Sequence, residues 1–284
     1  MKTKIRERKK NSYSLEEICR IAAIKGNLEI LKQVHEKNGS LKGVCRIAAK
    51  KGHLEILKWA YEKGCKLNPK ISYVAAQYGQ FEILKWLYEN NCEWDEKTTM
   101  WAAYEGHLDI LKWLIEKNCP WDESVCSCAA ENDHFDVLKW ARENGCSWDH
   151  KTCSSAAFEN NFDILKWAHE NGCEWDFMSC VGAGLNGNIE MLQWLRDNNC
   201  PWNKETISRA AYAGHLELIK WAHENGCPWD KHACANAAFS GHLELIKWLR
   251  ENGAPWNKLT IQMAQLAKND EIIKWALENG CPQS

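Results

Sequence analysis

Apolar residues recur along this chain with a fixed period. A pair of small residues, most often ending in Ala, is followed after a short polar turn by an apolar stretch such as Leu108-Asp-Ile-Leu-Lys-Trp-Leu114. The second residue of the pair recurs at a spacing of 26 once and then 27 eight times, at positions 23, 49, 76, 103, 130, 157, 184, 211, 238 and 265. Because a fixed period indicates a stack of similar units, the pattern predicts ten units.

Each unit is predicted to contain two helices joined by a tight turn. In the unit 95–121, Asp95 is expected to be the helix N-cap, because its carboxylate can accept amide hydrogens of the first turn. The first helix should stop near Gly106. A second helix then carries an apolar face too broad for a solvated surface. Ser14 and Ser40 begin the first two units. The same cap position holds Asp or Asn in seven further units: Asn68, Asp122, Asp149, Asp176, Asn203, Asp230 and Asn257.

Every second helix is predicted to end at a Gly or Asn, fifteen residues after the small pair. These two residues best tolerate the left-handed backbone of a helix C-cap. The positions are Asn38, Gly64, Asn91, Asn118, Gly145, Gly172, Asn199, Gly226, Gly253 and Gly280. A Trp follows in seven units and is expected to fold back on the helix just ended: Trp94, Trp121, Trp148, Trp175, Trp202, Trp229 and Trp256.

The predicted domain organisation is a short tail followed by one uninterrupted solenoid over 14–281. Residues 1–13 form a basic tail that is expected to be disordered. No stretch of different composition separates the units, whose predicted bounds are near 14–39, 40–67, 68–94, 95–121, 122–148, 149–175, 176–202, 203–229, 230–256 and 257–281.

The stretch Ala237-Ala-Phe-Ser-Gly-His-Leu-Glu-Leu-Ile-Lys-Trp-Leu-Arg-Glu-Asn-Gly253-Ala resembles the ankyrin repeat. The resemblance implies an all-α, helix-turn-helix solenoid of about ten stacked ankyrin-like repeats. The usual ankyrin unit has 33 residues and a β-turn finger, so a 27-residue period implies shortened or absent fingers. The ankyrin Thr-Pro-Leu-His segment is missing, and its His position holds varied residues that include Arg20 and Arg46. Short, Trp-rich and Cys-rich units of this kind resemble those of amoebal, algal and giant-virus ankyrin proteins.

Ankyrin stacks are, as a family, partner-binding scaffolds without catalytic activity, so the resemblance implies a protein-protein interaction scaffold or adaptor. In the family, the first helix of each unit lines the concave side. Aromatic residues at variable positions of that helix are predicted partner-binding residues, since Trp and Tyr are favoured at interface hot spots: Tyr73, Trp101, Tyr104, Phe158, Tyr212 and Phe239. Trp101 with Tyr104 is the strongest candidate hot spot. The alternative is that several of these aromatics only fill space between neighbouring units.

The remaining unusual residues receive structural interpretations. The Trp row of the second helix, from Trp59 to Trp275, is interpreted as core, and the regular His position at 53, 107, 134, 215 and 242 as a turn hydrogen bond. Cysteines are interpreted as small buried residues, because equivalent ones in stacked helices lie too far apart for disulfides or a shared zinc. A variable second-helix row is interpreted as a solvated outer face: Tyr61, Tyr88, Arg142, His169, Arg196, His223 and Arg250. Gly182 and Gly184 weaken their helix, which predicts a soft point there.

Charge and missing motifs restrict the function further. The net charge is −2, with +5 in residues 1–10 and −7 in the remainder. The basic tail supports one alternative, a nucleic-acid-associated protein, whereas the acidic body is a poor surface for phosphates. No catalytic or nucleotide-binding motif occurs, so no enzyme activity, cofactor or metal is expected. The sequence shows no signal peptide and no apolar stretch of about 18 residues. We therefore expect no membrane partner and a location in the cytoplasm or nucleus, of the host cell if the chain is viral. We also expect a monomer, and a protein partner rather than a nucleic acid.

Overall fold

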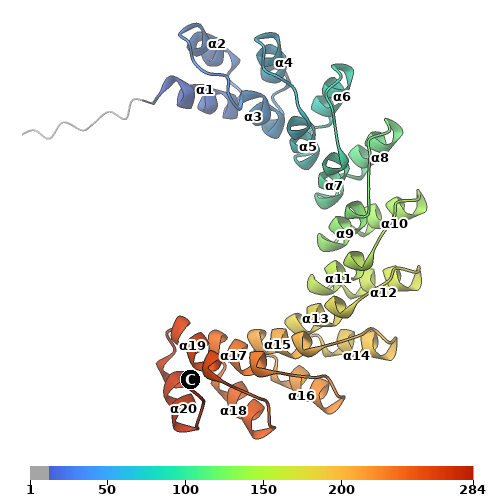
Figure 1. Ribbon diagram of the computed structural model, residues 1–284. Coiled ribbons are helices and arrows are strands. Elements are labelled where there is room, and N and C mark those ends of the chain that lie inside the picture. Colours follow the sequence, from blue (N-terminus) through green and yellow to red (C-terminus); the bar gives the residue numbers. More distant parts are fainter. Residues whose placement is uncertain (1–12, 284) are drawn as a thin grey trace, which may run out of the picture. The chain divides into compact units, whose positions relative to one another are not determined.

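The computed structural model describes residues 13–283, so the predicted tail lies outside the described residues except for Tyr13. Between 13 and 283 the chain forms twenty α-helices and no strand, which confirms the all-α fold (Figure 1). The first helices of the repeats are α1 (Leu15–Ile24), α3 (Val44–Lys51), α5 (Pro69–Gln77), α7 (Glu96–Tyr104), α9 (Ser124–Glu131), α11 (His150–Phe158), α13 (Phe177–Asn186), α15 (Lys204–Ala213), α17 (Lys231–Ser240) and α19 (Lys258–Leu266). The second helices are α2 (Leu28–Glu36), α4 (Leu54–Glu62), α6 (Phe81–Glu89), α8 (Leu108–Glu116), α10 (Phe135–Glu143), α12 (Phe162–Glu170), α14 (Ile189–Asp197), α16 (Leu216–Glu224), α18 (Leu243–Glu251) and α20 (Asp270–Glu278).

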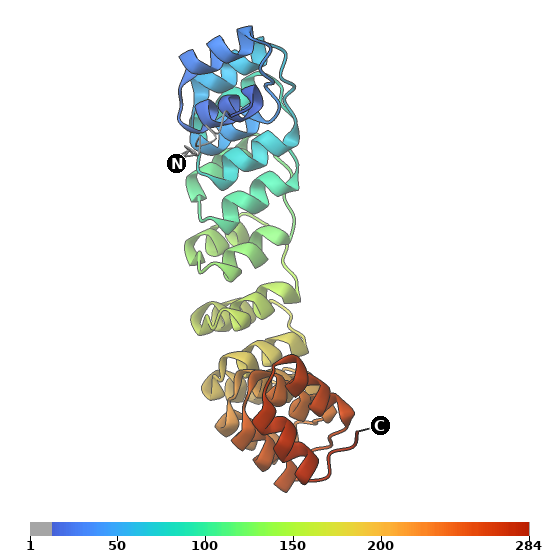
Figure 2. The ribbon, with the colours of Figure 1, turned by 90° about the vertical axis from the view of Figure 1, so that its left-hand side faces the viewer.

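The helices form two compact units, one up to Trp121 and one from Asp122 onward. The division coincides with a predicted repeat boundary. Within each unit every second helix packs on the first helix of its own repeat, and first helices pack against those of neighbouring repeats (Figure 2). The first unit holds α1 to α8 and the second holds α9 to α20.

Helix N-caps follow the predicted pattern with three differences. Ser14 and Glu17 form a complete capping box, and the predicted Asn or Asp side chain caps α5, α11, α13, α15, α17 and α19. Asp95 occupies the N-cap of α7, but its side chain accepts no hydrogen bond from the helix. Ser40 is not a cap, because α3 begins three residues later than expected, after Gly43. Asp122 accepts from the Ser124 amide, although α9 has Glu123 in its N-cap position.

The predicted helix ends are confirmed. All ten Gly or Asn positions have a positive φ, between 53° at Asn91 and 88° at Gly64. The left-handed residue reverses the chain and lets the next amide, at Cys92 for example, donate to a carbonyl of the helix that has just ended.

Cysteine and histidine side chains fix the repeats internally and to one another. Eight cysteines, one after each of eight second helices, have their sulfur 3.2–3.7 Å from the backbone carbonyl oxygen 24 residues earlier, at the start of the same repeat. The predicted turn role of histidine includes a bond to the preceding repeat: the Nε2 atom of His215 lies 3.0 Å from the Leu185 carbonyl oxygen. A Cβ atom on Gly187 would lie 2.5 Å from the same ring, so this turn requires glycine.

The Trp residues form an aromatic layer rather than a fully buried core. Leu111 and Ala102 are fully buried, whereas most Trp residues of the second helices are half-buried. These Trp rings meet the Trp rings of the loops edge to face, with centroids 5.8 Å apart for Trp94 and Trp113 and 5.5 Å apart for Trp175 and Trp194.

The second-helix row predicted to be solvated is instead largely covered by the loop Trp rings. The His169 ring stacks on Trp175 at 3.5 Å, and the Arg142 guanidinium lies 3.9 Å over Trp148. Tyr88, Arg196, His223 and Arg250 make the same contact with the Trp six residues later. The outer-face interpretation was therefore wrong for the His and Arg residues of this row, which are half-buried, whereas Tyr88 remains 42% exposed. The predicted folding back of the loop Trp is confirmed at these repeats.

Candidate protein-binding surface

The first unit presents an aromatic pair on α7. Trp101 and Tyr104 are three residues apart, so they lie on the same face of the helix. Their rings meet edge to face with centroids 5.2 Å apart, and both side chains are half-buried. The pair therefore offers a rigid apolar surface that is still partly accessible to solvent.

A second aromatic pair lies in the second unit. Tyr212 at the end of α15 and Phe239 at the end of α17 occupy the same position in successive repeats. Their rings are stacked, with centroids 6.2 Å apart, and they remain 43% and 42% exposed. Stacking of these equivalent side chains produces an exposed apolar strip that spans two successive repeats.

The two remaining predicted residues have different surroundings. Tyr73 lines a small hollow of about 290 Å³ together with Arg46, Lys50 and Tyr78. Phe158 is half-buried at the end of α11, where its carbonyl oxygen accepts a hydrogen bond of 2.7 Å from the Asn186 side chain. The structure thus brings four of the six predicted residues into two pairs and places Tyr73 among cations.

Sequence reasoning missed Tyr78, which belongs to this surface. Its ring is 40% exposed, and the Lys50 Nζ atom lies 4.5 Å from the ring centroid. Tyr78 lies two residues after the small pair, at one of the variable first-helix positions. That position was the available signal, and a cation that pairs with the ring could only be seen in the structure.

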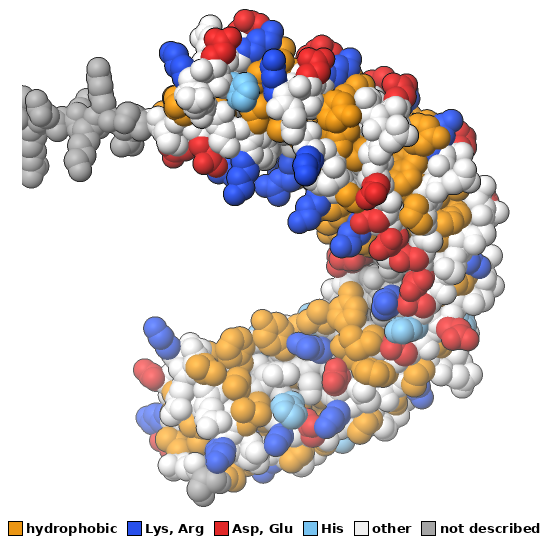
Figure 3. All heavy atoms as spheres, turned by 45° about the horizontal axis from the view of Figure 1, so that its top comes forward, with side chains coloured by type: hydrophobic (Ala, Val, Ile, Leu, Met, Phe, Trp, Pro, Cys, Tyr) orange, Lys and Arg blue, Asp and Glu red, His pale blue; other side chains and the backbone are white. Residues whose placement is uncertain are grey.

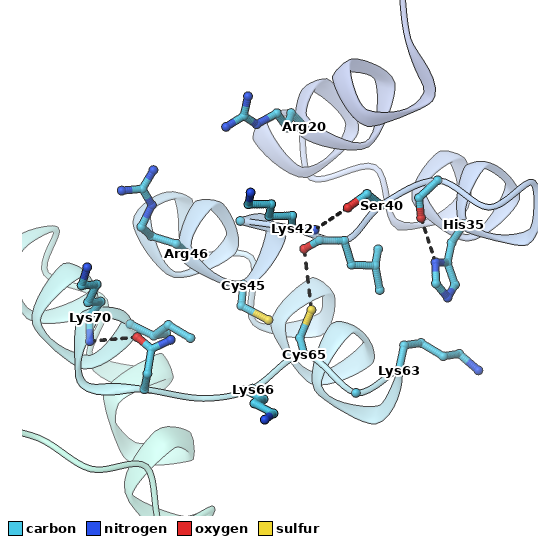
Figure 4. A pocket seen from close by; sticks show the side chains of 16 residues that line it. Arg20, His35, Ser40, Lys42, Cys45, Arg46, Lys63, Cys65, Lys66 and Lys70 are labelled. Atoms are coloured by element: carbon cyan, nitrogen blue, oxygen red, sulfur yellow. Dashed lines mark hydrogen bonds between the residues drawn. The ribbon is translucent and has the colours of Figure 1, made fainter.

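Two thiols from the same repeat also meet at this surface. Cys45 on α3 and Cys65 after α4 point toward each other (Figure 4). A hydrogen bond from the Cys45 thiol lowers the pKa of Cys65 to about 7. Cys153 likewise lowers the pKa of Cys173, but Cys173 is buried, whereas Cys65 is partly exposed. The interpretation of cysteines as isolated apolar residues missed these pairs, since it compared only equivalent positions.

We predict that Cys65 is alkylated fastest among the cysteines near pH 7.5, because thiolate is the reactive form and a pKa of about 7 leaves most of this thiol ionised. Burial raises the pKa of Cys119 and Cys227 to about 12, so these thiols stay protonated. Mass spectrometry after brief treatment with iodoacetamide measures the order. Cys45→Ala should slow labelling of Cys65, and Cys173 should stay unlabelled in the folded chain. Equal rates at Cys65 and Cys119 would contradict the assignment.

Between residues 13 and 283, no group of three or more His, Cys, Asp or Glu side chains could hold a metal ion. No helix in the described part is long and apolar enough to cross a membrane.

Comparison with known proteins identifies the repeat. The family model described as ankyrin repeats, in three copies, matches residues 72–152, and the same helix pair recurs on both sides of that segment. The family model identifies residues 72–152 as ankyrin repeats. Ankyrin repeats are in general modules of protein–protein interaction, and their fold is typically a non-catalytic scaffold.

The chain also resembles solved ankyrin structures. One of them is the crystal structure of the human ASB11 ankyrin repeat domain, with 18% identity, a TM-score of 0.47, and coverage of 55% of this chain and 84% of that one. A comparison with curated protein sequences finds no match.

Proposed function

We propose that this ankyrin protein is a scaffold that binds a partner protein on its first-helix face and catalyses no reaction. The observation that carries the proposal is the Trp101–Tyr104 pair, a partly exposed aromatic contact at positions that vary among the repeats. Core positions such as Ala102 and Ala103 stay nearly constant, as the packing of neighbouring helices requires. Aromatic residues that vary beside a constant core are typical of a recognition surface.

The second unit carries an aromatic pair of its own. Tyr212 and Phe239 are exposed apolar rings, and burying them against a partner would release water from both. We propose that these pairs are the principal contacts and that Tyr73 and Phe158 contribute at their edges.

The proposal includes the setting in which the scaffold works. We propose that the ten repeats form one continuous stack and that the chain is a monomer inside the cell, in the cytoplasm or nucleus. All fifteen cysteines are free, which suits a reducing compartment. The alternative of nucleic-acid binding through residues 2–10 lies outside the described residues, and no observation on the described chain favours it.

The test is a comparison of two variants in partner capture. The full chain is immobilised and exposed to an extract of the cells in which it is expressed, and the captured protein is identified and then titrated as a pure protein. Trp101→Ala should weaken its binding by roughly 30-fold or more, the loss of about 2 kcal/mol that is typical of an aromatic hot spot. Tyr61→Ala removes an exposed aromatic side chain from a second helix and should leave binding unchanged. Equal effects of the two variants would overturn the proposal.

A further inference from the structure

A hollow of about 650 Å³ between the first repeats carries an unusual concentration of positive charge. Its walls come from α1, α3, α5, the end of α2 with His35, and the neighbouring loops, and no Asp or Glu is among the lining residues (Figure 4). We call it the basic hollow, and its cations are Arg20, Lys42, Arg46, Lys63, Lys66 and Lys70.

None of these six cations takes part in an ion pair among residues 13–283, and all six are exposed. By contrast, Lys32 and Lys58 on the second helices of the same repeats pair with a Glu three residues earlier, at 3.2 and 3.1 Å. Like charges gathered without counter-charges raise the local positive potential, which attracts anions. The first helices therefore differ electrostatically from the second helices of the same repeats.

The charge changes sign along the first unit. Residues 14–79 contain twelve Lys and Arg against six Asp and Glu, a net charge of +6. Residues 80–121 contain four Lys and Arg against eight Asp and Glu, a net charge of −4. Figure 3 shows Lys and Arg side chains gathered over the first repeats, with Asp and Glu side chains following them. A long polyanion that extended beyond the basic hollow would therefore meet repulsion, whereas a short acidic segment would not.

The apolar side chains in the walls of the basic hollow are nearly buried, and exposed apolar surface is supplied beside it by Tyr78, which is 40% exposed. Leu41 and Ile71 line the basic hollow beside Cys45 and Cys65. Arg46 is shared with the smaller hollow that holds Tyr73 and Tyr78. A ligand that fits both hollows would carry several carboxylates and at least one apolar or aromatic side chain.

We infer that the basic hollow binds a short acidic segment of the partner protein, rich in Asp and Glu and containing an aromatic residue. This inference rests on the proposed scaffold function and assigns the partner a chemistry. The guanidinium groups of Arg20 and Arg46 can each hold a carboxylate through two hydrogen bonds. The lysines around them add charge, and the tyrosines contact the aromatic residue.

The experiment uses the full chain and a fluorescent peptide of about eight residues, roughly 27 Å when extended, that contains Asp, Glu and one Tyr. Anisotropy should show saturable binding that weakens as salt is added, because the attraction is electrostatic. The double variant Arg46→Glu/Lys70→Glu should lose at least about tenfold in affinity. Lys25→Glu/Lys37→Glu changes the net charge equally at exposed positions of the first repeats outside the hollow, and it should bind the peptide within about twofold of the unchanged chain. Bound peptide should also slow alkylation of Cys65, which lines the hollow.

Four results would overturn the inference. The first is that a peptide with Asn and Gln in place of Asp and Glu binds as tightly as the acidic peptide, and the second is that a single-stranded oligonucleotide binds more tightly than that peptide. The third is that both double variants lose the same affinity for the peptide. The fourth is that the chain self-associates and Arg46→Glu/Lys70→Glu abolishes the self-association. The Trp101→Ala variant separates this inference from the proposed function. If the chain binds the acidic peptide and the Trp101→Ala variant still captures the partner, the basic hollow is supported and the aromatic hot spot is refuted.

Discussion

Replacing Trp113 with Ala should lower the free energy of unfolding by about 3–5 kcal/mol. Trp113 is the centre of an aromatic cluster in the first unit, with ring centroids of Phe81, Tyr88 and Trp94 at 5.5, 5.8 and 5.8 Å. Each such pair contributes about 0.5–1.5 kcal/mol beyond the area it buries. Since these rings come from two successive repeats and the loop between them, their loss loosens the packing of one repeat on the next.

Denaturant unfolding followed by circular dichroism measures the Trp113 effect. Trp113→Phe keeps an aromatic edge at the centre of the cluster and should lose clearly less than Trp113→Ala. A change below about 1 kcal/mol in the Ala variant, the range of an ordinary surface substitution, would show that the cluster does not stabilise the stack.

Gly182→Ala should destabilise the second unit by about 1–3 kcal/mol, the usual cost of an added methyl group in a packed core. Gly182 is buried in α13, and a Cβ atom there would lie 2.7 Å from the Phe158 backbone nitrogen and 2.8 Å from the Ala157 carbonyl carbon. Both are backbone atoms of the neighbouring helix α11, which cannot move aside as a flexible side chain would. On the other side of α13, a Cβ atom on Gly184 would lie 2.7 Å from the Thr206 carbonyl oxygen.

The sign of the Gly182→Ala effect decides between two explanations of the glycine. Helix propensity alone predicts that Ala is more favourable by about 1 kcal/mol, whereas close helix packing predicts a loss. Thermal and denaturant unfolding of the full chain give the sign. A gain in stability would show that α11 and α13 do not approach as closely as the structure has them. The soft point expected at this helix from its glycines stays a prediction.

The periodic part of the fold could be predicted from the sequence. Helix pairs, left-handed helix ends and most N-caps follow from residues that recur every 27 positions, because local backbone chemistry fixes them. Asp95 differs from the prediction only in its side chain. It occupies the predicted N-cap, but its buried Oδ1 atom has no hydrogen-bond partner among the described residues.

Contacts between unlike positions of a repeat could not be predicted in the same way. Arg142 meets Trp148 six residues later, and Cys45 meets Cys65 twenty residues later. A comparison of equivalent positions across repeats cannot show which different positions face each other, because that depends on how the two helices and the loop pack. The basic hollow was missed for the same reason, although Arg20 and Arg46 already stood out at the position where ankyrin repeats have His.

The proposed surface rests on a distinction between aromatic residues that bind and aromatic residues that stabilise. Among residues 13–283, Trp101 contacts the ring of Tyr104, whereas Trp113 contacts the rings of Phe81, Tyr88 and Trp94. Trp113→Ala should therefore cost the fold more than Trp101→Ala, even though both side chains are half-buried.

The most direct test of the account is the free energy of unfolding of Trp101→Ala, measured beside Trp113→Ala under the same conditions. The account predicts that Trp101→Ala loses less than half as much stability as Trp113→Ala and still fails to hold the partner. Equal losses of stability in the two variants would contradict it, since Trp101 would then belong to the packing of the repeats and not to a surface kept free for binding.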